Sequence, residues 1–361
     1  MAAKVETNSM NNSSPQAMVI GGGGYIGSEV VRTLSARGFR ITALHHHNPV
    51  RGDGVRSIKG DLRTFDWSRL EDDLPDVIIH SGRIPGRTWP GRILAGMQGR
   101  RANARLMKWL NGIPVPPALV YVSGTLVYGS RGELETDESA PLNPVGFQKY
   151  YVQAEYPFLS AAKNGNVPVY ITRVPWVLGP DSWFRQFYWR AMQNQHEIPC
   201  FGDGENLMSV VHLRDCADLI VRISEAAGGN AMMQRPGGAV WDGARVSVRD
   251  DMNAGSPDGI HDGLEDEAAS PGIYNIATIP AVSQQRFCQT LSGITGIPVR
   301  YYDERRLRAS YGKTVTEALT FSLSLASVRD VVNSWHPQFP TVGTALDDVV
   351  RSLGYRNVVG L

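Results

Sequence analysis

A cluster of glycines near the start of the chain constrains the fold more than any other feature of the sequence. It follows a short apolar run and precedes a stretch with helical periodicity, in AMVIGGGGYIGSEVVRTLSARGFRITAL from residue 17 onward. A strand, a glycine turn, a helix and a second β-rich run make a βαβ unit. Gly21, Gly24 and Gly27 have GxxGxxG spacing, which at such a junction indicates a dinucleotide-binding site, with the helix N-terminus facing a pyrophosphate.

Further apolar runs follow at 76–80, 118–123 and 167–174, separated by helix-compatible segments. Alternation of apolar strands with helices predicts an α/β fold, a Rossmann-type doubly wound parallel sheet covered on both faces. After residue 178 the alternation becomes irregular and rich in aromatic residues, which indicates a smaller C-terminal substrate-binding lobe. We therefore expect a dinucleotide-binding core over residues 17–180 and a lobe over 181–361 whose strands return to the core.

Two segments have a different character. The polar residues 1–16 predict a disordered tail without an apolar signal core. Residues 228–272 are rich in Gly, Asp, Ala and Ser, and we expect a flexible, acidic, solvated insertion without the ligand spacing of a calcium loop. Within it, AVWDGARVSV predicts a hairpin, because Asp242-Gly243 suits a tight turn between alternating runs.

The overall composition narrows the class of partner. The chain has 361 residues and a formal net charge of +1, so neither nucleic acid nor an anionic membrane is expected as the main partner. No apolar run approaches the roughly 20 residues of a membrane span. The three cysteines lack metal or redox spacing, so we expect no metal site and reduced core thiols in a cytoplasmic protein: Cys200, Cys216 and Cys288.

Further segments resemble motifs of one known family in their order along the chain: GDLRT (60–64), DVIIHSGR (76–83), RANARLM (101–107), YVSGTLVYG (121–129), ITRVPWVLGP (171–180), FGDGENLMSVVHLRDCADLI (201–220) and GIYNIA (272–277). Together with the glycine motif they resemble the extended short-chain dehydrogenase/reductase family, which includes NAD-dependent nucleotide-sugar epimerases and dehydratases. The resemblance implies that Asp61 contacts adenine. It also implies cofactor contacts from Tyr25, Ile26, Leu62 and Ser81.

The end of the second expected strand bears on the choice of nicotinamide cofactor. An acidic residue there would bind the ribose 2′-hydroxyl of NAD, but the strand runs into HHHNPVRGDG with no carboxylate before Asp53. His45 and its two histidine neighbours, with Arg51, suit a phosphate better than a hydroxyl, so the sequence favours NADP over NAD. A solvated loop remains the alternative, and a shared metal is disfavoured because consecutive side chains on an extended segment alternate in direction.

The family's catalytic pair is missing. The resemblance implies a tyrosine acid/base and, four residues later, a lysine that holds the nicotinamide ribose, yet no YxxxK occurs in the chain. In NPVGFQKYYVQAE (143–155), one alignment places Val145 at the tyrosine and keeps Lys149 as the lysine. A second alignment, anchored on Glu155, places Phe147 and Tyr151 at the two positions. We prefer the first, because Pro144 would begin the helix there and Lys149 is retained.

Several residues could replace the missing acid. Tyr150 and Tyr151 directly follow Lys149, although both could instead pack on the sheet or at a dimer face. Ser123 and Thr125 flank Gly124, which stands where the family commonly has a hydroxyl, and either could bind a substrate oxygen. Three other polar residues we expect to be structural, with the last capping the helix that follows it: His80, His212 and Asp215.

Arginines and aromatic residues indicate the substrate. Arg83 stands where the family usually has a small residue beside the nicotinamide, and with Arg87 it would suit a phosphate or carboxylate. We expect the arginines from residue 92 to 105 to lie mostly on a solvated helix face. The segment 181–190 includes Trp183 and would line a substrate pocket or form core. We therefore expect a small-molecule substrate, anionic with an apolar part, and a homodimer, as family members often form.

Three functions remain open at this point. The first is an NAD(P)-binding epimerase/dehydratase-like oxidoreductase with a non-standard acid, acting on a small metabolite in a biosynthetic pathway. The second is a non-redox lyase, isomerase or cyclase that keeps the nucleotide pocket. The third is a non-catalytic, nucleotide-binding regulatory protein. Family resemblance places the first ahead of the second, although a fold alone does not determine the chemistry.

Overall fold

Seven parallel strands form the central sheet of the computed structural model, which describes residues 14–233, 240–241, 246–247 and 269–355. Their order across the sheet is β14-β7-β5-β4-β1-β2-β3, and every neighbouring pair is parallel. The strands are β1 (Gln16–Ile20), β2 (Arg40–His45), β3 (Val55–Lys59), β4 (Val77–His80), β5 (Ala118–Gly124), β7 (Val169–Val174) and β14 (Gly272–Asn275). The predicted Rossmann-type parallel sheet is confirmed.

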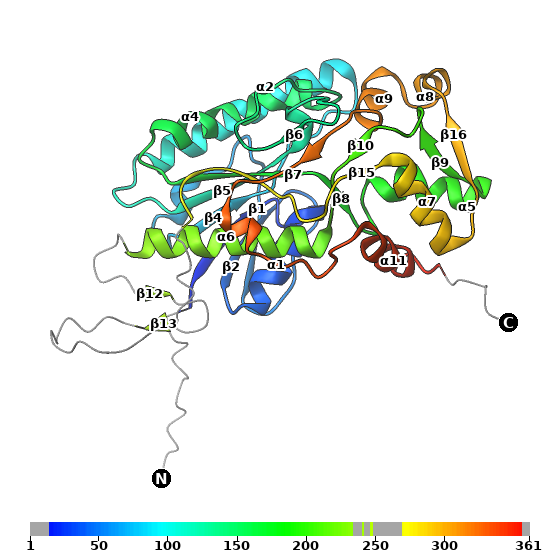
Figure 1. The fold of residues 1–361 in the computed structure, drawn as a ribbon. Coiled ribbons are helices and arrows are strands. Elements are labelled where there is room, and N and C mark those ends of the chain that lie inside the picture. The colour runs from blue at the N-terminus through cyan, green and yellow to red at the C-terminus, as the bar shows by residue number, and fades with distance from the viewer. Residues whose placement is uncertain (1–13, 234–239, 242–245, 248–268, 356–361) are drawn as a thin grey trace, which may run out of the picture.

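Helices cover both faces of this sheet, as Figure 1 shows. On one face lie α1 (Tyr25–Ala36) and α6 (Leu213–Met233), which pack against each other. On the other lie α2 (Trp89–Leu110), the short α3 (Gln148–Tyr151) and α4 (Tyr156–Asn164). The helices after β1 and β7 therefore cover one face, and those after β4 and β5 cover the other. This is the doubly wound arrangement expected when apolar strands are buried on both sides.

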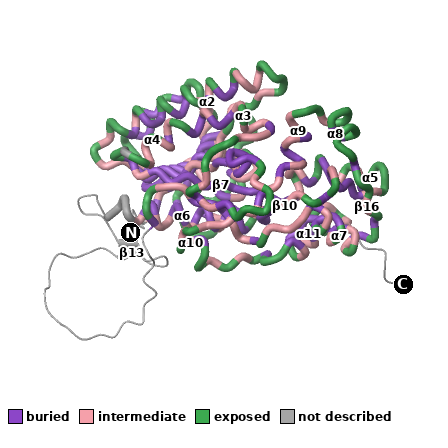
Figure 2. The backbone as a smooth tube through the Cα atoms, turned by 45° about the horizontal axis from the view of Figure 1, so that its top comes forward, coloured by how far each residue is buried: buried purple, intermediate pink, exposed green. Residues whose placement is uncertain are grey.

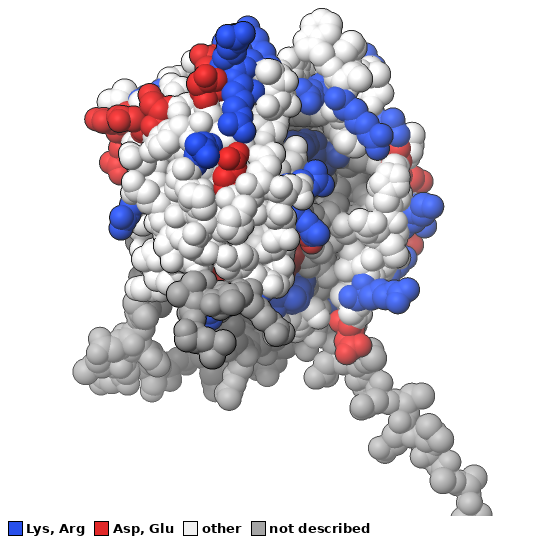
Figure 3. Space-filling model, turned by 90° about the vertical axis from the view of Figure 1, so that its right-hand side faces the viewer, with Lys and Arg blue, Asp and Glu red and all other residues white. Residues whose placement is uncertain are grey.

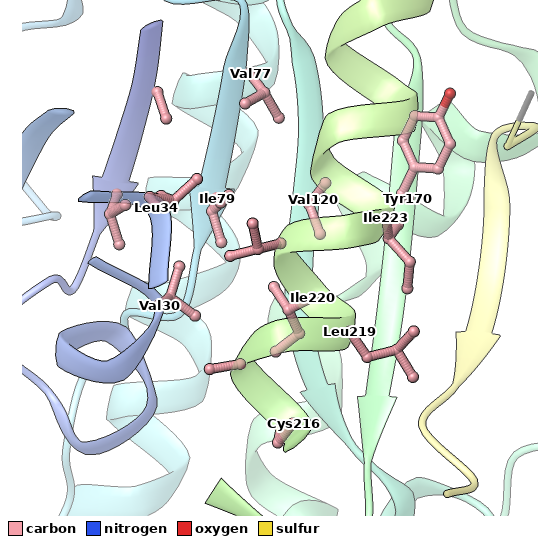
Figure 4. Close-up of a cluster of buried hydrophobic side chains, with 14 of the residues drawn as sticks. Val30, Leu34, Val77, Ile79, Val120, Tyr170, Cys216, Leu219, Ile220 and Ile223 are labelled. Carbon is pink, nitrogen blue, oxygen red and sulfur yellow. The ribbon is translucent and has the colours of Figure 1, made fainter. Parts of the chain in front are cut away.

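Aliphatic side chains fill the space between the sheet and the helices α1 and α6. In α6, Cys216, Leu219, Ile220 and Ile223 recur at three- and four-residue spacing, so one face of the helix meets the strands (Figure 4). Figure 2 shows the same division along the whole chain, with buried strands inside and helices exposed on their outer sides. Removal of these apolar side chains from water is the main contribution to the stability of the core.

A second lobe packs beside the carboxyl ends of the strands and has a core rich in aromatic residues. Its helices are α5 (Arg190–Gln195), α7 (Gln284–Thr295), α8 (Glu304–Tyr311), α9 (Lys313–Leu319) and α11 (Val342–Ser352). The short α10 (Asp330–Asn333) packs instead against α6 of the core. Its paired strands are β8 (Trp176–Leu178) with β11 (Val210–His212), β9 (Ile198–Phe201) with β16 (Val299–Tyr302), β10 (Leu207–Met208) with β15 (Val282–Ser283), and β6 (Glu135–Thr136) with β17 (Ser324–Leu325). Before β15 and the rest of the lobe, the chain returns to the central sheet through β14.

The expected insertion lies only partly within the described residues. The helix α6 continues to Met233, so residues 228–233 are helical rather than part of a loop. β12 (Val240–Trp241) pairs antiparallel with β13 (Val246–Ser247), as the predicted hairpin requires, while its turn lies outside the described residues. The rest of the acidic stretch up to residue 268 and the first thirteen residues of the tail also lie outside them. Both expected boundaries are off at one end, because Gly272 already belongs to β14 and Gln16 to β1.

All three cysteines are buried and unbridged in the structure: Cys200, Cys216 and Cys288. Within the ranges that the structure describes, no helix has both the length and the apolar character to cross a membrane.

Candidate functional site

The glycine loop has the geometry that a close approach of chains requires. Gly21 has φ +82°, and a Cβ there would lie 2.7 Å from the backbone of Gly82, so this turn admits only glycine. A Cβ on Gly27 would collide with the carbonyl oxygen of Gly21. Gly24 is the N-cap of α1 and has no side chain to cap the first amides of the helix, and residues 24–27 line a cavity.

Two cavities of about 840 and 640 Å³ meet at this loop. The larger lies between the core and the second lobe, and the smaller extends over the ends of β1 and β2. The residues that line both are Gly24, Leu62, Ser81, Gly82, Arg83, Ile84, Pro85 and Ala95. The two cavities are therefore parts of one long cleft at the carboxyl ends of the parallel strands.

Most of the expected cofactor residues line this cleft. Tyr25, Ile26 and Gly27 line the larger cavity, while Gly21, His45 and Asp61 line the smaller one. Gly24, Leu62 and Ser81 line both. Arg51 and Lys149 line neither cavity, so the structure does not bring these two to the cleft.

The smaller cavity contains a cation that the sequence interpretation overlooked. Arg63 donates from Nε to the carboxylate of Asp61 at 3.0 Å, and this contact lowers the pKa of Asp61 to about 2. His46 lies against the same carboxylate, with its Nε2 3.7 Å from Oδ2. His45 instead turns its Nδ1 toward the hydroxyl of Ser57, at 3.0 Å. Spacing alone could not identify Arg63, because an exposed arginine in a loop looks the same wherever it points.

Beneath the larger cavity lies a buried polar network. Ser123 donates its hydroxyl to Glu155 Oε2 at 2.5 Å, and Arg173 donates to Glu155 Oε1 at 2.8 Å. Both members of the ion pair are 1% exposed. Ser123 and Thr125 both line the cavity, but the proton of Ser123 is already committed to Glu155. Of the two hydroxyls, Thr125 is therefore the one better placed to meet a substrate oxygen.

In the stretch 143–155, residues 143–147 are not helical, and α3 and a 3-10 turn follow, before α4 with Pro157 in its first turn. Pro144 therefore does not begin the helix, as the first alignment expected. Val145 packs with Phe321 and Leu323 in an apolar cluster and does not line the cavity. Lys149 is 46% exposed and its Nζ lies 2.8 Å from Oε2 of Glu317. The side chains that this stretch presents to the larger cavity are Phe147, Gln148, Tyr151 and Ala154. Tyr150, like Lys149, lies outside this lining.

Tyr151 and Arg83 contact each other at the junction of the two cavities. The guanidinium carbon of Arg83 lies 4.8 Å from the ring centre of Tyr151 and 5.7 Å from that of Phe147. The amide of Gly86 donates to the Tyr151 hydroxyl at 3.0 Å. Two other tyrosines line the larger cavity, Tyr25 and Tyr121, but burial raises the pKa of each above its ordinary value.

The remaining arginines divide between cleft and surface. Arg87 lines the smaller cavity and Arg92 the larger one, so Arg92 is not on a purely solvated face. Arg100 instead lies over the ring of Tyr156, and Arg105 donates to the carbonyl of Phe65 at 3.0 Å, which holds the loop after β3. In the face that Figure 3 shows, lysine and arginine side chains gather around a recess in the surface.

The aromatic segment divides in the same way. Trp183 and Phe187 line the larger cavity, together with Trp176 and Phe321. The rings of Trp176 and Trp183 lie 4.9 Å apart, centre to centre. Phe184 and Tyr188 are fully buried in the core of the second lobe.

The residues expected to be structural are all buried. His80 is bonded from Nε2 to Asn103 Oδ1 at 3.0 Å, and burial lowers its pKa to about 4. His212 Nε2 lies 3.1 Å from Asp348 Oδ2. Asp215 does not cap the helix that follows it: its carboxylate accepts the amides of Gln338 and Phe339, both at 2.9 Å, because it lies inside the first turn of α6.

The cleft, the glycine loop and the seven-stranded sheet define a nucleotide-binding α/β protein of the Rossmann type. Residues 17–233 match the sequence model of the NAD-dependent epimerase/dehydratase family, and the chain belongs to that family. No curated protein sequence matches the chain.

Solved structures of the same fold cover nearly the whole chain. One is the human epimerase family protein SDR39U1 (isoform 2) with NADPH, at 18% identity, 94% of this chain, 100% of that chain and a TM-score of 0.66. Another is the UDP-N-acetylglucosamine 4-epimerase of Methanobrevibacter ruminantium in complex with UDP-N-acetylmuramic acid. It is 17% identical, the match covers 94% of this chain and 98% of that chain, and the TM-score is 0.68. A third is the dTDP-glucose 4,6-dehydratase of Bacillus anthracis in complex with NAD. It is 16% identical, the match covers 94% of this chain and 96% of that chain, and the TM-score is 0.66. At such identities the likeness establishes the fold.

Proposed function

We propose that this protein is an NAD(P)-dependent enzyme of the oxidoreductase and epimerase type, acting on a small metabolite in a biosynthetic pathway of the cytoplasm. The observation that supports this most is the single long cleft, in which the smaller cavity and the larger one beside the second lobe meet at the glycine loop. Ligands of open α/β sheets bind at this edge of the sheet, and a cleft of two cavities has room for both a dinucleotide and a substrate.

The glycine loop fits a pyrophosphate. Among the described residues other than its two chain neighbours, the one atom within 4 Å of a Cβ added to Gly24 is the Gly21 oxygen, at 3.1 Å, so this end of α1 has room for a ligand. The pyrophosphate would lie against the amides of Tyr25 and Ile26, and Ser81 and Leu62 would border the middle of the cofactor. When bound, the nicotinamide would supply or accept a hydride. The similar structures that carry NADPH or NAD support this assignment.

NADP is the cofactor we favour over NAD. Arg63 and the histidines after β2 line the adenosine end of the cleft, and a guanidinium and imidazoles suit a 2′-phosphate. Asp61 is already paired with Arg63, which leaves this carboxylate less able to accept a ribose hydroxyl.

Tyr151 is the residue we propose as acid/base, in the second of the two alignments. Its hydroxyl lies at the cavity, accepts the Gly86 amide, and belongs to a ring beneath the Arg83 guanidinium. A donated hydrogen bond and a nearby cation both stabilise negative charge that develops on the phenol oxygen during proton transfer. Thr125 would bind the same substrate oxygen. A role for Lys149 at the ribose would require it to leave Glu317.

A matched set of hydroxyl deletions tests this proposal. Tyr151→Phe removes one oxygen, and we expect it to lower kcat with a carbonyl substrate by about a hundredfold or more, with little change in NADPH affinity. Tyr156→Phe, at an exposed position on α4, is the control and should match the unmodified protein. Loss of turnover in Tyr150→Phe instead of Tyr151→Phe would assign the role to Tyr150 and overturn the proposal.

A non-redox lyase, isomerase or cyclase is the second candidate function. One observation favours it: no lysine lines the larger cavity within the described part of the chain, and a phenylalanine occupies one of the aligned catalytic positions. Turnover that persists with a nicotinamide analogue unable to transfer hydride would establish this function. If the protein binds NADPH but transforms no substrate, the non-catalytic regulatory alternative is correct.

We also propose a substrate that is anionic with an apolar part, and a homodimeric assembly. The arginines and tryptophans of the cleft support the first proposal, and exposed apolar side chains on α2 and α4 support the second.

A further inference from the structure

The second lobe closes the cleft with an apolar wall. Trp176, Trp183, Phe187 and Phe321 line the larger cavity from this side, joined by Val315, Ala318 and Leu319. The rings contact one another, with Trp176 4.9 Å from Trp183 and 6.2 Å from Phe321. Aromatic walls of this kind gain binding free energy by covering apolar surface of a ligand.

Among the described residues of the second lobe, no lysine or arginine lines either cavity. The charged side chain that the second lobe contributes to the lining is Asp181, and Arg185 neutralises it at 2.6 Å. A sugar nucleotide must place a pyrophosphate here, away from the glycine loop that the cofactor would occupy. Buried phosphates require arginines, lysines or free helix amides. The lobe's side chains at the larger cavity supply no such cation.

The cations of the larger cavity lie on the core side and are unpaired. Arg83 and Arg92 line it, and among the described residues neither guanidinium has a carboxylate or any other hydrogen-bond acceptor. Arg83 is held in place from below by the rings of Phe147 and Tyr151. A guanidinium fixed on aromatic faces with free donors is suited to a planar carboxylate, which it binds with two hydrogen bonds.

We infer that the substrate is a small monocarboxylate with an aromatic or bulky aliphatic group, and not a sugar nucleotide. Its carboxylate binds Arg83, with Arg92 nearby, and its apolar group lies against the tryptophan wall of the second lobe. The reacting oxygen then lies between the two, where Thr125 and Tyr151 line the cavity. This inference rests on the proposed function, because it takes the smaller cavity and the glycine loop to be filled by the cofactor.

Calorimetry on the full chain saturated with NADP+ tests the inference with matched probes. The probe is 4-phenyl-2-oxobutanoate, and 2-oxobutanoate lacks its ring while 4-phenyl-2-butanone lacks its carboxylate. We expect each deletion to weaken binding by about tenfold or more, from lost apolar burial and lost charge-assisted hydrogen bonds respectively. We expect no binding of UDP-glucose. UDP-glucose binding in preference to the phenyl acid, or no binding of the phenyl acid, would overturn the inference.

Two variants assign the parts of the probe to their residues. Arg83→Gln should abolish the preference for the acid over the ketone and keep the preference for the phenyl group. Trp183→Leu should abolish the preference for the phenyl group and keep the preference for the acid over the ketone. Arg69→Gln is the matched control, because Arg69 also lies over an aromatic ring, that of Phe65, but outside both cavities. If either variant lost affinity equally for 2-oxobutanoate, which has only the acid, and for 4-phenyl-2-butanone, which has only the ring, the assigned orientation would be wrong.

NADP+ binding, measured first, separates the two levels of the proposal. If the unmodified chain binds no nicotinamide nucleotide, the proposed function fails. If it binds NADP+ and then prefers UDP-glucose, the proposed function stands and the substrate inference alone fails.

Discussion

At the scale of single residues, the active site depends on which side chains of 145–155 reach the cleft. Phe147 and Tyr151 line it, whereas Val145 packs in an apolar cluster and Lys149 pairs with Glu317. The sequence defined both alignments and favoured the first, but a four-residue helix leaves the register to tertiary packing. The retained lysine favoured the first alignment in the sequence, yet an exposed lysine forms an ion pair with any carboxylate nearby, as Lys149 does with Glu317.

Restoring the family's tyrosine separates the two alignments. Phe147→Tyr adds a hydroxyl to a ring that already lines the cavity, and we expect carbonyl reduction to rise by several-fold or more as a second donor reaches the substrate oxygen. Val145→Tyr adds its phenol to the cluster with Phe321 and should lower thermal stability without a gain in rate. A gain in Val145→Tyr alone would restore the first alignment.

His80 makes stability depend on pH in a defined direction. Its imidazole is fully buried, and its pKa falls from 6.5 to about 4 because burial disfavours the charged form. Below pH 6.5 the imidazole of the unfolded chain therefore binds a proton, whereas that of the folded chain stays neutral. The contribution of neutral His80 to the free energy of unfolding is complete above pH 6.5 and is lost as the pH falls toward 4. The loss amounts to about 3 kcal/mol.

Denaturant unfolding at neutral and acid pH measures this effect. His80→Phe has no titrating group at this position, so its free energy of unfolding should fall less between the two pH values than that of the unmodified protein. Equal falls in both proteins would show that His80 titrates normally.

At the scale of elements, the glycine loop joins fold and function in one turn. Gly24→Ala places a methyl group where the pyrophosphate would lie, with a single neighbour at 3.1 Å, so we expect NADPH affinity to fall by about tenfold or more with little change in thermal stability. Gly27→Ala meets the Gly21 backbone and should lower the free energy of unfolding by about 1–3 kcal/mol. Thermal scans with and without NADPH compare the two variants. Equal affinity in Gly24→Ala would exclude this loop as the pyrophosphate site.

The sequence predicted those parts of the site that depend on local pattern, and it missed those that depend on contacts between distant residues. The sheet, the glycine loop and the residues near it followed from local periodicity and spacing, and the structure brings Gly21, Gly24, Ser81 and Asp61 to one cleft. Arg63 and Arg92 were missed because the direction of a long side chain depends on contacts that are distant in sequence. The end of α6 was placed too early for a different reason, since glycines 228 and 229 look like a helix stop but lie inside the helix.

At the scale of the whole molecule, we expect α2 and α4 to form a homodimer interface. Trp89 is 63%, Tyr156 43% and Met97 41% exposed, so these two helices present large apolar side chains to solvent. Met97→Asp should convert the dimer to a monomer in light scattering after gel filtration, and NADPH binding should persist because Met97 lines neither cavity. A dimer that survives Met97→Asp would place the interface elsewhere.

The central claim is that Tyr151, rather than Lys149, serves the nicotinamide end of the cleft. A crystal structure with bound NADP+ tests it most directly, by the distances from the nicotinamide to Tyr151 Oη and Lys149 Nζ. The account predicts that Tyr151 Oη lies within hydrogen-bond reach of an oxygen placed at the nicotinamide C4, while Lys149 stays paired with Glu317. A structure in which Lys149 leaves Glu317 and bonds the nicotinamide ribose, with Tyr151 out of reach, would contradict it.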